Sequence, residues 1–262
     1  MREATRRVVV ASVAIDAVTE SEVIDIVVEA ARRGDGGILA TPNLDHLAMV
    51  RSGLFDRRLL DDADLVVADG MPLVWASRIA GNPLPERVAG SKLLPKLCGA
   101  AASAGLPVVF LGGRVGAGDK AAADLRSRYP ALEVRAVICP PLGFDKTAEG
   151  RAGVVADVVA AGPSLVFTAL GAPKQEQVNA WLAPHVPSAW LVSCGATLDM
   201  IAGDVVRAPA WVQRTGMEWL WRLAQEPQRL AGRYLIRDLP FAGRLFSAAA
   251  VARWRISIAK RV

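Results

Sequence analysis

Short apolar runs alternate with longer amphipathic segments along most of this chain, and no other feature limits its fold as strongly. Seven runs have the length and composition of buried strands: 8–13, 38–41, 65–68, 107–111, 134–138, 165–170 and 190–193. Segments with helical spacing lie among them: 20–33, 44–52, 72–80, 92–104, 119–129, 148–161 and 174–183. Apolar strands that alternate with helices are typical of a parallel sheet covered on both faces. We therefore predict an α/β, Rossmann-like fold with a mainly parallel sheet.

The C-terminal part differs from the rest in charge. From residue 205 onward, eleven Arg or Lys face three Asp or Glu, a net charge of +8, so residues 1–204 carry −3 of the chain's +5. Four arginines recur at helical spacing within a sector of about 80°: Arg222, Arg229, Arg233 and Arg237. Pro227 lies inside this pattern and predicts a break or kink. We expect two units, an α/β catalytic domain (1–204) and a basic helical appendage (205–262).

The partner of this appendage is indicated by the aromatic residues between its arginines. These are Trp219, Trp221 and Trp254. Indole rings favour the membrane interface, so an anionic membrane surface is a better partner than nucleic acid. No run of about 18 apolar residues occurs, and the N-terminal apolar stretch is too short for a signal peptide. We expect a cytoplasmic protein that is peripheral on the inner face of the plasma membrane.

Three cysteines lie far apart in the chain, at Cys98, Cys139 and Cys194. An odd, widely spaced set of this kind is typical of buried thiols in a reducing compartment. The histidines, His46 and His185, have no neighbouring cluster of ligands. The sequence therefore predicts neither a zinc site nor a histidine-based catalytic triad.

Polar or glycine-rich turns follow four of the predicted strands. They are Thr41-Pro-Asn43-Leu-Asp45, Asp69-Gly-Met-Pro72, Gly112-Gly-Arg-Val-Gly116-Ala-Gly118 and Gly171-Ala-Pro-Lys-Gln175-Glu176. The carboxyl ends of parallel strands open onto a common crevice. Each turn also begins a helix, whose N-terminal N–H groups can bind a phosphate. Together the turns predict a pocket for a nucleotide or a sugar nucleotide.

Each turn also has a purely structural explanation. Thr41 and Asn43 are residue types that cap helices, and Asp69-Gly70 suits an ordinary turn. The glycine-rich turn lacks the Lys-Ser/Thr of a P-loop and the glycine spacing of dinucleotide-binding loops. Asp62-Ala-Asp64 spells a metal-binding triplet of many sugar-nucleotide transferases, but it precedes its strand and so lies at the wrong edge of the sheet.

A set of motifs in a fixed order adds to this prediction. In order they are Thr41-Pro-Asn43, Asp69-Gly70, Arg87-Val-Ala-Gly90, Gly171-Ala-Pro-Lys-Gln175-Glu176, Gly195-Ala-Thr-Leu-Asp199, Arg207-Ala-Pro209, Glu218-Trp-Leu-Trp-Arg222, Glu226-Pro227 and Arg229. This series, over residues 8–237, resembles the WecG/TagA/CpsF glycosyltransferase family.

The resemblance implies an inverting transferase that needs no metal and no cofactor. Such enzymes move a sugar, typically N-acetylmannosamine, from a UDP donor to undecaprenyl-diphosphate-linked N-acetylglucosamine in the synthesis of teichoic acid or other surface polysaccharides. The resemblance makes Asp69 the expected catalytic base. An aspartate has an ordinary pKa of about 3.9 and is a weak base unless burial raises that value.

The remaining site residues are expected from the turns and the family motifs together. For substrate binding they are Thr41, Asn43, Gly70, Arg87, Gly112, Gly171, Gln175, Glu176 and Asp199. For the lipid diphosphate or the membrane they are Arg207, Arg214, Arg222, Arg229, Arg233 and Arg237. Glu176 could instead pair locally, and Asp199 could cap a turn.

One departure from the family pattern concerns substrate choice. Where related sequences usually have an aspartate after the Arg87 motif, this chain has Ser91-Lys92. Family members that use glucose, glucuronate or N-acetylmannosaminuronate are therefore alternatives. A nucleotide-dependent oxidoreductase and a non-catalytic membrane adaptor are alternatives from other classes, and the sequence leaves homo-oligomer formation open.

Overall fold

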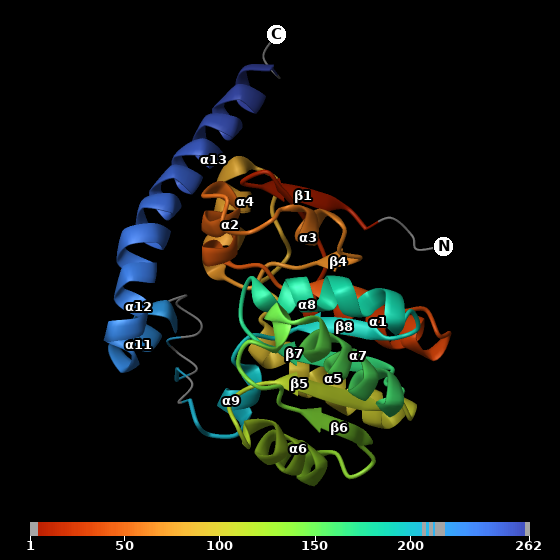
Figure 1. Cartoon of the computed structure of the whole chain (residues 1–262). Coiled ribbons are helices and arrows are strands. Elements are labelled where there is room, and N and C mark those ends of the chain that lie inside the picture. The colour runs from red at the N-terminus through yellow and green to blue at the C-terminus, as the bar shows by residue number, and fades with distance from the viewer. Residues whose placement is uncertain (1–4, 206–207, 210–211, 213–217, 260–262) are drawn as a thin grey trace.

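Six parallel strands form the central sheet, in the order β4-β3-β8-β7-β5-β6 (Figure 1). A computed structural model describes residues 5–205, 208–209, 212 and 218–259 of the protein. The strands are β3 (Gly37–Ala40), β4 (Leu65–Val66), β5 (Val108–Gly112), β6 (Val134–Ile138), β7 (Leu165–Ala169) and β8 (Trp190–Ser193). Each pair of neighbours is parallel. The predicted α/β fold is confirmed, and the last strand, β8, lies between β3 and β7.

The apolar run at 8–13 does not join this sheet, so the prediction of a single buried strand there is wrong. It belongs to an antiparallel hairpin of β1 (Arg7–Val10) and β2 (Val13–Asp16). Ala11 and Ser12, with φ of 48° and 73°, form the turn. Both values lie in the left-handed region that two-residue hairpin turns require. Neither residue is a usual signal for such a turn, so the sequence pattern concealed it.

Helices connect the strands as the sequence predicts. They are α1 (Glu20–Arg32), α2 (Leu44–Arg51), α3 (Arg58–Asp61), α4 (Met71–Ala80), α5 (Gly90–Ala104), α6 (Ala117–Arg128), α7 (Ala148–Ala161), α8 (Lys174–Leu182) and α9 (Thr197–Ile201), with 3-10 turns η1 (Phe144–Lys146) and η2 (Ala183–His185). The predicted helices begin and end within two residues of these bounds. The short helices α3 and α9 were not predicted, because four or five residues are too few for a helical period to show.

Both faces of the sheet are covered by apolar layers. Phe110 and Phe167, from neighbouring strands, point to the face packed by α1, α5 and α6, and their ring centroids are 5.8 Å apart. Val109 and Val166 point to the opposite face, where α7 and α8 pack. Successive strand residues alternate between faces, so strands buried on both sides must be apolar throughout. This explains the uninterrupted apolar runs in the sequence.

The C-terminal segment forms a chain of helices along one side of the sheet unit (Figure 1). It consists of α11 (Glu218–Gln225), α12 (Pro227–Ala231), the π-helix η3 (Gly232–Asp238) and α13 (Leu239–Ala259). The predicted break at Pro227 is confirmed, since α11 ends before it and α12 begins with it. Phe241, Leu245 and Ala249 of α13 are buried in a cluster with side chains of α2 and α4. The division into units 1–204 and 205–262 stays a prediction.

The predictions of buried cysteines and of a protein without membrane-spanning helices can be compared with the structure. Cys98 and Cys194 are buried free thiols, and burial raises the pKa of both. Cys139 is exposed, contrary to expectation, because it follows the edge strand β6. Among the residues that the structure describes, no helix is both long enough and apolar enough to cross a bilayer.

Candidate functional site

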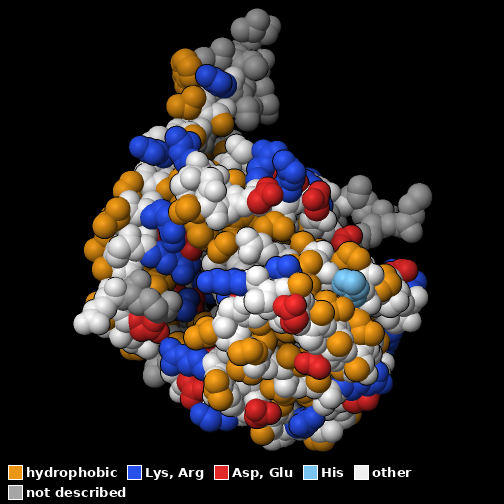
Figure 2. Space-filling view, viewed as in Figure 1, with side chains coloured by type: hydrophobic (Ala, Val, Ile, Leu, Met, Phe, Trp, Pro, Cys, Tyr) orange, Lys and Arg blue, Asp and Glu red, His pale blue; other side chains and the backbone are white. Residues whose placement is uncertain are grey.

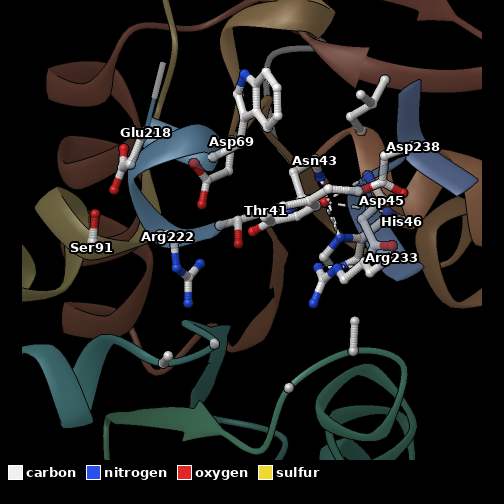
Figure 3. A pocket seen from close by; sticks show the side chains of 18 of the residues that line it. Thr41, Asn43, Asp45, His46, Asp69, Ser91, Glu218, Arg222, Arg233 and Asp238 are labelled. Atoms are coloured by element: carbon white, nitrogen blue, oxygen red, sulfur yellow. Dashed lines mark hydrogen bonds and ion pairs between the residues drawn. The ribbon is translucent and has the colours of Figure 1, made fainter. Parts of the chain in front are cut away.

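A cavity of about 720 Å³ opens at the carboxyl ends of the strands. Turns after β3, β4, β5, β7 and β8 contribute to one wall, and the C-terminal segment supplies the other (Figure 3). Figure 2 shows Lys and Arg side chains gathered in the hollow where the two meet. Of the residues predicted from sequence, this cavity brings together Thr41, Asn43, Asp69, Gly70, Arg87, Gly171, Gln175, Asp199, Arg222 and Arg233.

Asp69 follows β4 and lies at the wall of the cavity. Its Oδ2 accepts a hydrogen bond of 3.2 Å from the backbone N–H of Gly90, at the start of α5. Desolvation raises the pKa of the Asp69 carboxyl, the charge of Arg87 lowers it and the charge of Glu218 raises it, with a net increase. A carboxylate with a raised pKa is a stronger base than a solvated aspartate.

Arg87 joins the two walls of the cavity. Its Nη1 donates to Oε2 of Glu218 on α11 at 3.2 Å, and the two side chains are 11% and 18% exposed. The family motifs that contain these residues are 131 positions apart, and the tertiary structure brings them into one ion pair beside Asp69. The C-terminal segment therefore contributes directly to the surroundings of Asp69.

Thr41 and Asn43 both line the cavity, but of the two only Asn43 also caps a helix. Thr41 Oγ1 donates to the carbonyl of Ser193 at 3.1 Å and so ties the ends of β3 and β8. Asn43 Oδ1 accepts from the backbone N–H groups of Asp45 and His46, at 3.0 and 3.3 Å, and caps α2. With Oδ1 engaged in this way, the amide nitrogen of Asn43 is the group that the side chain can offer to a ligand.

Gln175 is held by a buried hydrogen-bond network. Its Oε1 accepts from the N–H of Gly195 at 3.0 Å, and its Nε2 donates to Oε1 of Glu176 at 2.7 Å. The same Glu176 oxygen lies 3.6 Å from Nε2 of His46. Burial raises the pKa of Glu176, but the hydrogen bond and charge of His46, together with the hydrogen bond from Gln175, lower it by a larger amount, so the net change is a decrease. Glu176 is behind the wall rather than in it, which matches the alternative of local pairing.

Two further predicted residues shape the turn after β5. Asp199 Oδ1 accepts from the backbone N–H of Arg114 at 2.8 Å, so this carboxylate both lines the cavity and fixes the turn. Gly112 is not part of the cavity wall. Its φ is +99°, and an added Cβ would lie 2.5 Å from the carbonyl oxygen of Ala169. Glycine is needed there because two neighbouring strands approach closely.

Two arginines of the C-terminal segment lie in the cavity wall, and a third lies next to it. Arg222 and Arg233 line the cavity, while Arg237 lies behind Asp45, with which both Arg233 and Arg237 form ion pairs. Arg207 and Arg214, and the side chain of Arg229, lie outside the described residues. The appendage side of the cavity carries Arg222 and Arg233 beside Glu218, Glu226 and Asp238, and contact of the arginines with a membrane stays a prediction.

Several lining residues were not singled out from the sequence for this role. They include Asp45, His46, Ser91, Arg114, Trp75, Trp219, Tyr234 and Asp238. Local signals existed for four of them: Asp45 and Arg114 lie within predicted turns, His46 follows one, and Ser91 follows the Arg87 motif. The others depend on how distant segments pack. Asp64 Oδ2 accepts from the N–H of Ile38 at 2.8 Å, at the amino end of β3, so the wrong-edge prediction for Asp62-Ala-Asp64 is confirmed. Within the described ranges, no group of three or more His, Cys, Asp or Glu could hold a metal ion.

Asp238 and Asp45 lie together between two arginines, and this predicts a pH-dependent stability. Desolvation, with the charge and hydrogen bond of Asp45, raises the pKa of Asp238 from 3.8 to about 7, although Arg233 and Arg237 lower it. Between these values the folded protein binds more protons than the unfolded chain, so stability falls as pH rises from about 4 to 7. We expect the melting temperature of Asp238→Asn to fall less than that of the native protein between pH 5 and pH 8.

The control for this prediction is Asp25→Asn, the same change at an exposed position of α1. Asparagine can still donate a hydrogen bond to Asp45, as a protonated Asp238 would. Equal slopes of melting temperature against pH for the native protein and both variants would contradict the prediction.

Comparison with known proteins adds two findings. The model of the family described as "Glycosyl transferase WecG/TagA/CpsF family" matches residues 8–255. A Bacillus subtilis (strain 168) protein, the N-acetylglucosaminyldiphosphoundecaprenol N-acetyl-beta-D-mannosaminyltransferase, is 28% identical over 197 residues. That alignment covers 74% of this chain and 73% of the relative.

Proposed function

Because the family match covers nearly its whole length, the chain belongs to the WecG/TagA/CpsF family of glycosyltransferases, and we propose that it transfers N-acetylmannosamine from a UDP-sugar to undecaprenyl-diphosphate-linked N-acetylglucosamine. We further propose that transfer inverts the anomeric centre and needs no metal. The name of the relative supports the sugar and the acceptor. The site residues and their roles are part of the same proposal.

One observation carries the proposal more than any other: a carboxyl of raised pKa shares a cavity with several arginines. Asp69, Arg87, Arg222 and Arg233 all line it, and they come from both walls. A transfer from a nucleoside diphosphate to a lipid diphosphate brings two anionic groups to one centre. Arginine binds phosphate oxygens through a planar fork of donors, so the arginines of this cavity suit the diphosphates of both substrates, beside the carboxylates that also line it.

The reaction then follows from the positions of these groups. The acceptor hydroxyl attacks the anomeric carbon from the face opposite UDP, and Asp69 takes the hydroxyl proton as the new C–O bond forms. The bond from the anomeric carbon to the phosphate oxygen breaks, and its electron pair leaves with UDP. Arg87 offsets the charge that develops on the departing diphosphate.

The two walls of the cavity divide the substrates between them. We assign the donor to the turns of unit 1–204, where Thr41, Asn43 and Gln175 present polar groups. We assign the acceptor diphosphate to unit 205–262, through Arg222 and Arg233. The +8 charge of that unit supports its attachment to an anionic membrane surface, on the inner face where lipid-linked sugars of this kind are extended.

Donor choice is the part of the proposal with the closest alternatives. Ser91 lines the cavity and Lys92 is exposed outside it, in the stretch where related sequences usually have an aspartate. A neutral hydroxyl in place of a carboxylate removes a charge from the wall. Because of this difference in charge, UDP-glucose, UDP-glucuronate and UDP-N-acetylmannosaminuronate are alternative donors.

The test is UDP release from a panel of UDP-sugars with an N-acetylglucosamine acceptor on a short prenyl diphosphate. EDTA is present in one arm, and the anomeric configuration of the product is read by NMR. We expect release that requires the acceptor, is highest with UDP-N-acetylmannosamine and survives EDTA. Faster release from another donor would reassign the substrate. No release from any donor, with retained binding to acidic vesicles, would support the adaptor alternative.

A further inference from the structure

Beyond its polar centre, the cavity has an apolar end between α4 and α13. Its wall consists of Met71, Pro72 and Trp75 from α4 and Leu239, Ala242 and Phe246 from α13. The two helices pack side by side, although they lie at opposite ends of the chain (Figure 1). None of these side chains is charged, in contrast to the arginines farther along the same cavity.

This apolar end is built into the fold. Phe241 and Leu245 of α13 are buried against the sheet unit, and Ala242 and Phe246 follow each of them by one residue. Successive residues of a helix point about 100° apart, so one face of α13 packs against the sheet unit while the neighbouring face lines the cavity. Trp75 and Leu239 remain 36% and 55% exposed, so the apolar end is open to solvent.

The apolar end begins close to the proposed base. α4 starts directly after Asp69 and Gly70, and Met71 and Trp75 lie one turn apart, about 6 Å along the helix axis. On the other wall, Arg233 precedes Leu239 in a continuous helical segment. A ligand that reaches the cations and Asp69 with its head therefore has an apolar surface directly beside it.

We propose that this end of the cavity binds the first isoprene units of the acceptor's hydrocarbon chain. The inference rests on the proposed function and adds a subsite to it. The acceptor has an anionic diphosphate joined directly to a branched hydrocarbon. The arginines and the apolar side chains follow one another along the cavity in the same order. A sugar nucleotide has no group that would cover these six side chains.

The proposal makes catalytic efficiency depend on the length of the acceptor's tail. Burying one methylene-sized group changes affinity by roughly four-fold. We expect kcat/KM to be at least about ten-fold higher for an acceptor with three isoprene units than for one with a single unit, since each added unit buries several such groups. The acceptors are used below their micelle concentrations and without membranes, so the tail can bind only to the protein.

Variants of the wall test where the tail binds. Trp75→Ala and Phe246→Ala should lower the three-unit to one-unit ratio toward one. Ala242→Trp fills the apolar end of the cavity and should lower the same ratio by blocking the tail rather than by removing apolar contacts. The matched control is Trp254→Ala, an identical change on α13 at a side chain that is 65% exposed and outside the cavity wall. Melting curves show which variants are folded, and one folded variant of the wall is sufficient to test the subsite.

The outcomes separate this inference from the proposed function. A ratio near one for the native protein, or an equal fall in Trp254→Ala and the wall variants, would overturn the subsite while transfer itself stands. If no acceptor is glycosylated, the proposed function fails. Calorimetric titration with prenyl diphosphates that lack the sugar then tests the subsite directly: tighter binding with each unit, lost in Trp75→Ala, supports it, and binding independent of length refutes it.

Discussion

Replacing Asp69 with asparagine is expected to reduce sugar transfer by about 10²- to 10⁴-fold, the usual contribution of a general base. Asparagine keeps the size of the side chain but cannot accept the acceptor's proton. UDP binding should change little, since the proposed contacts to the donor come from other residues. The measurement is kcat for acceptor-dependent UDP release, with UDP affinity from titration.

Asp62→Asn is the matched control, because Asp62 is exposed and lies at the other edge of the sheet. The acid limb of kcat/KM against pH adds a second check. Desolvation raises the pKa of Asp69, so activity should fall as pH drops through a value above the ordinary 3.8 of an aspartate. Normal turnover in Asp69→Asn would refute its assignment as the base.

Removing Arg87 is expected to have the second largest effect. In Arg87→Ala the departing diphosphate loses a cation, and comparable losses of transition-state charge stabilisation cost about 10²- to 10³-fold in kcat. Glu218 also loses its partner at a position where its side chain is only 18% exposed, and it then repels Asp69 without compensation. We expect both a lower kcat and a lower melting temperature.

A second substitution separates the two effects. In the double variant Arg87→Ala, Glu218→Ala the unpaired carboxylate is gone, so the melting temperature should recover toward that of the native protein. Activity should not recover, because the cation is still missing. Arg135→Ala, on the exposed edge strand β6, is the control for loss of an arginine elsewhere. Recovery of activity in the double variant would show that Arg87 acts only as a structural partner.

The predicted strand ends show how far the sequence leads toward the site. Parallel strands place their carboxyl ends at one edge, so the turns containing Thr41, Asp69 and Gly171 were expected near one another, and the structure places all three residues in the cavity wall. Gly112 stands in an equivalent turn but is outside the wall. Its glycine is required by a close approach to Ala169, a contact between strands that no local pattern reveals.

The C-terminal arginines show where the sequence stops. Their spacing predicted a helical segment with a basic stripe and a break at Pro227, and the structure contains helices on both sides of that break. The stripe could face water, a membrane or another part of the chain with equal ease. The ion pairs of Arg233 and Arg237 with Asp45 depend on a carboxylate nearly two hundred positions away.

The sequence by itself determined the fold class, the helices and the set of strand ends, because uninterrupted apolar runs, the helical period of 3.6 residues and turn-forming residues are local features of the chain. It also determined the break at Pro227, since proline disrupts a helix wherever it occurs in the interior. Only the tertiary structure decided that Glu218 pairs with Arg87, that Arg222 and Arg233 line the cavity and that α4 and α13 enclose an apolar end. These features arise from packing between segments that are distant in the sequence. The free energy that favours one packing over another is a sum over side chains from all of these segments, so no single segment reveals it.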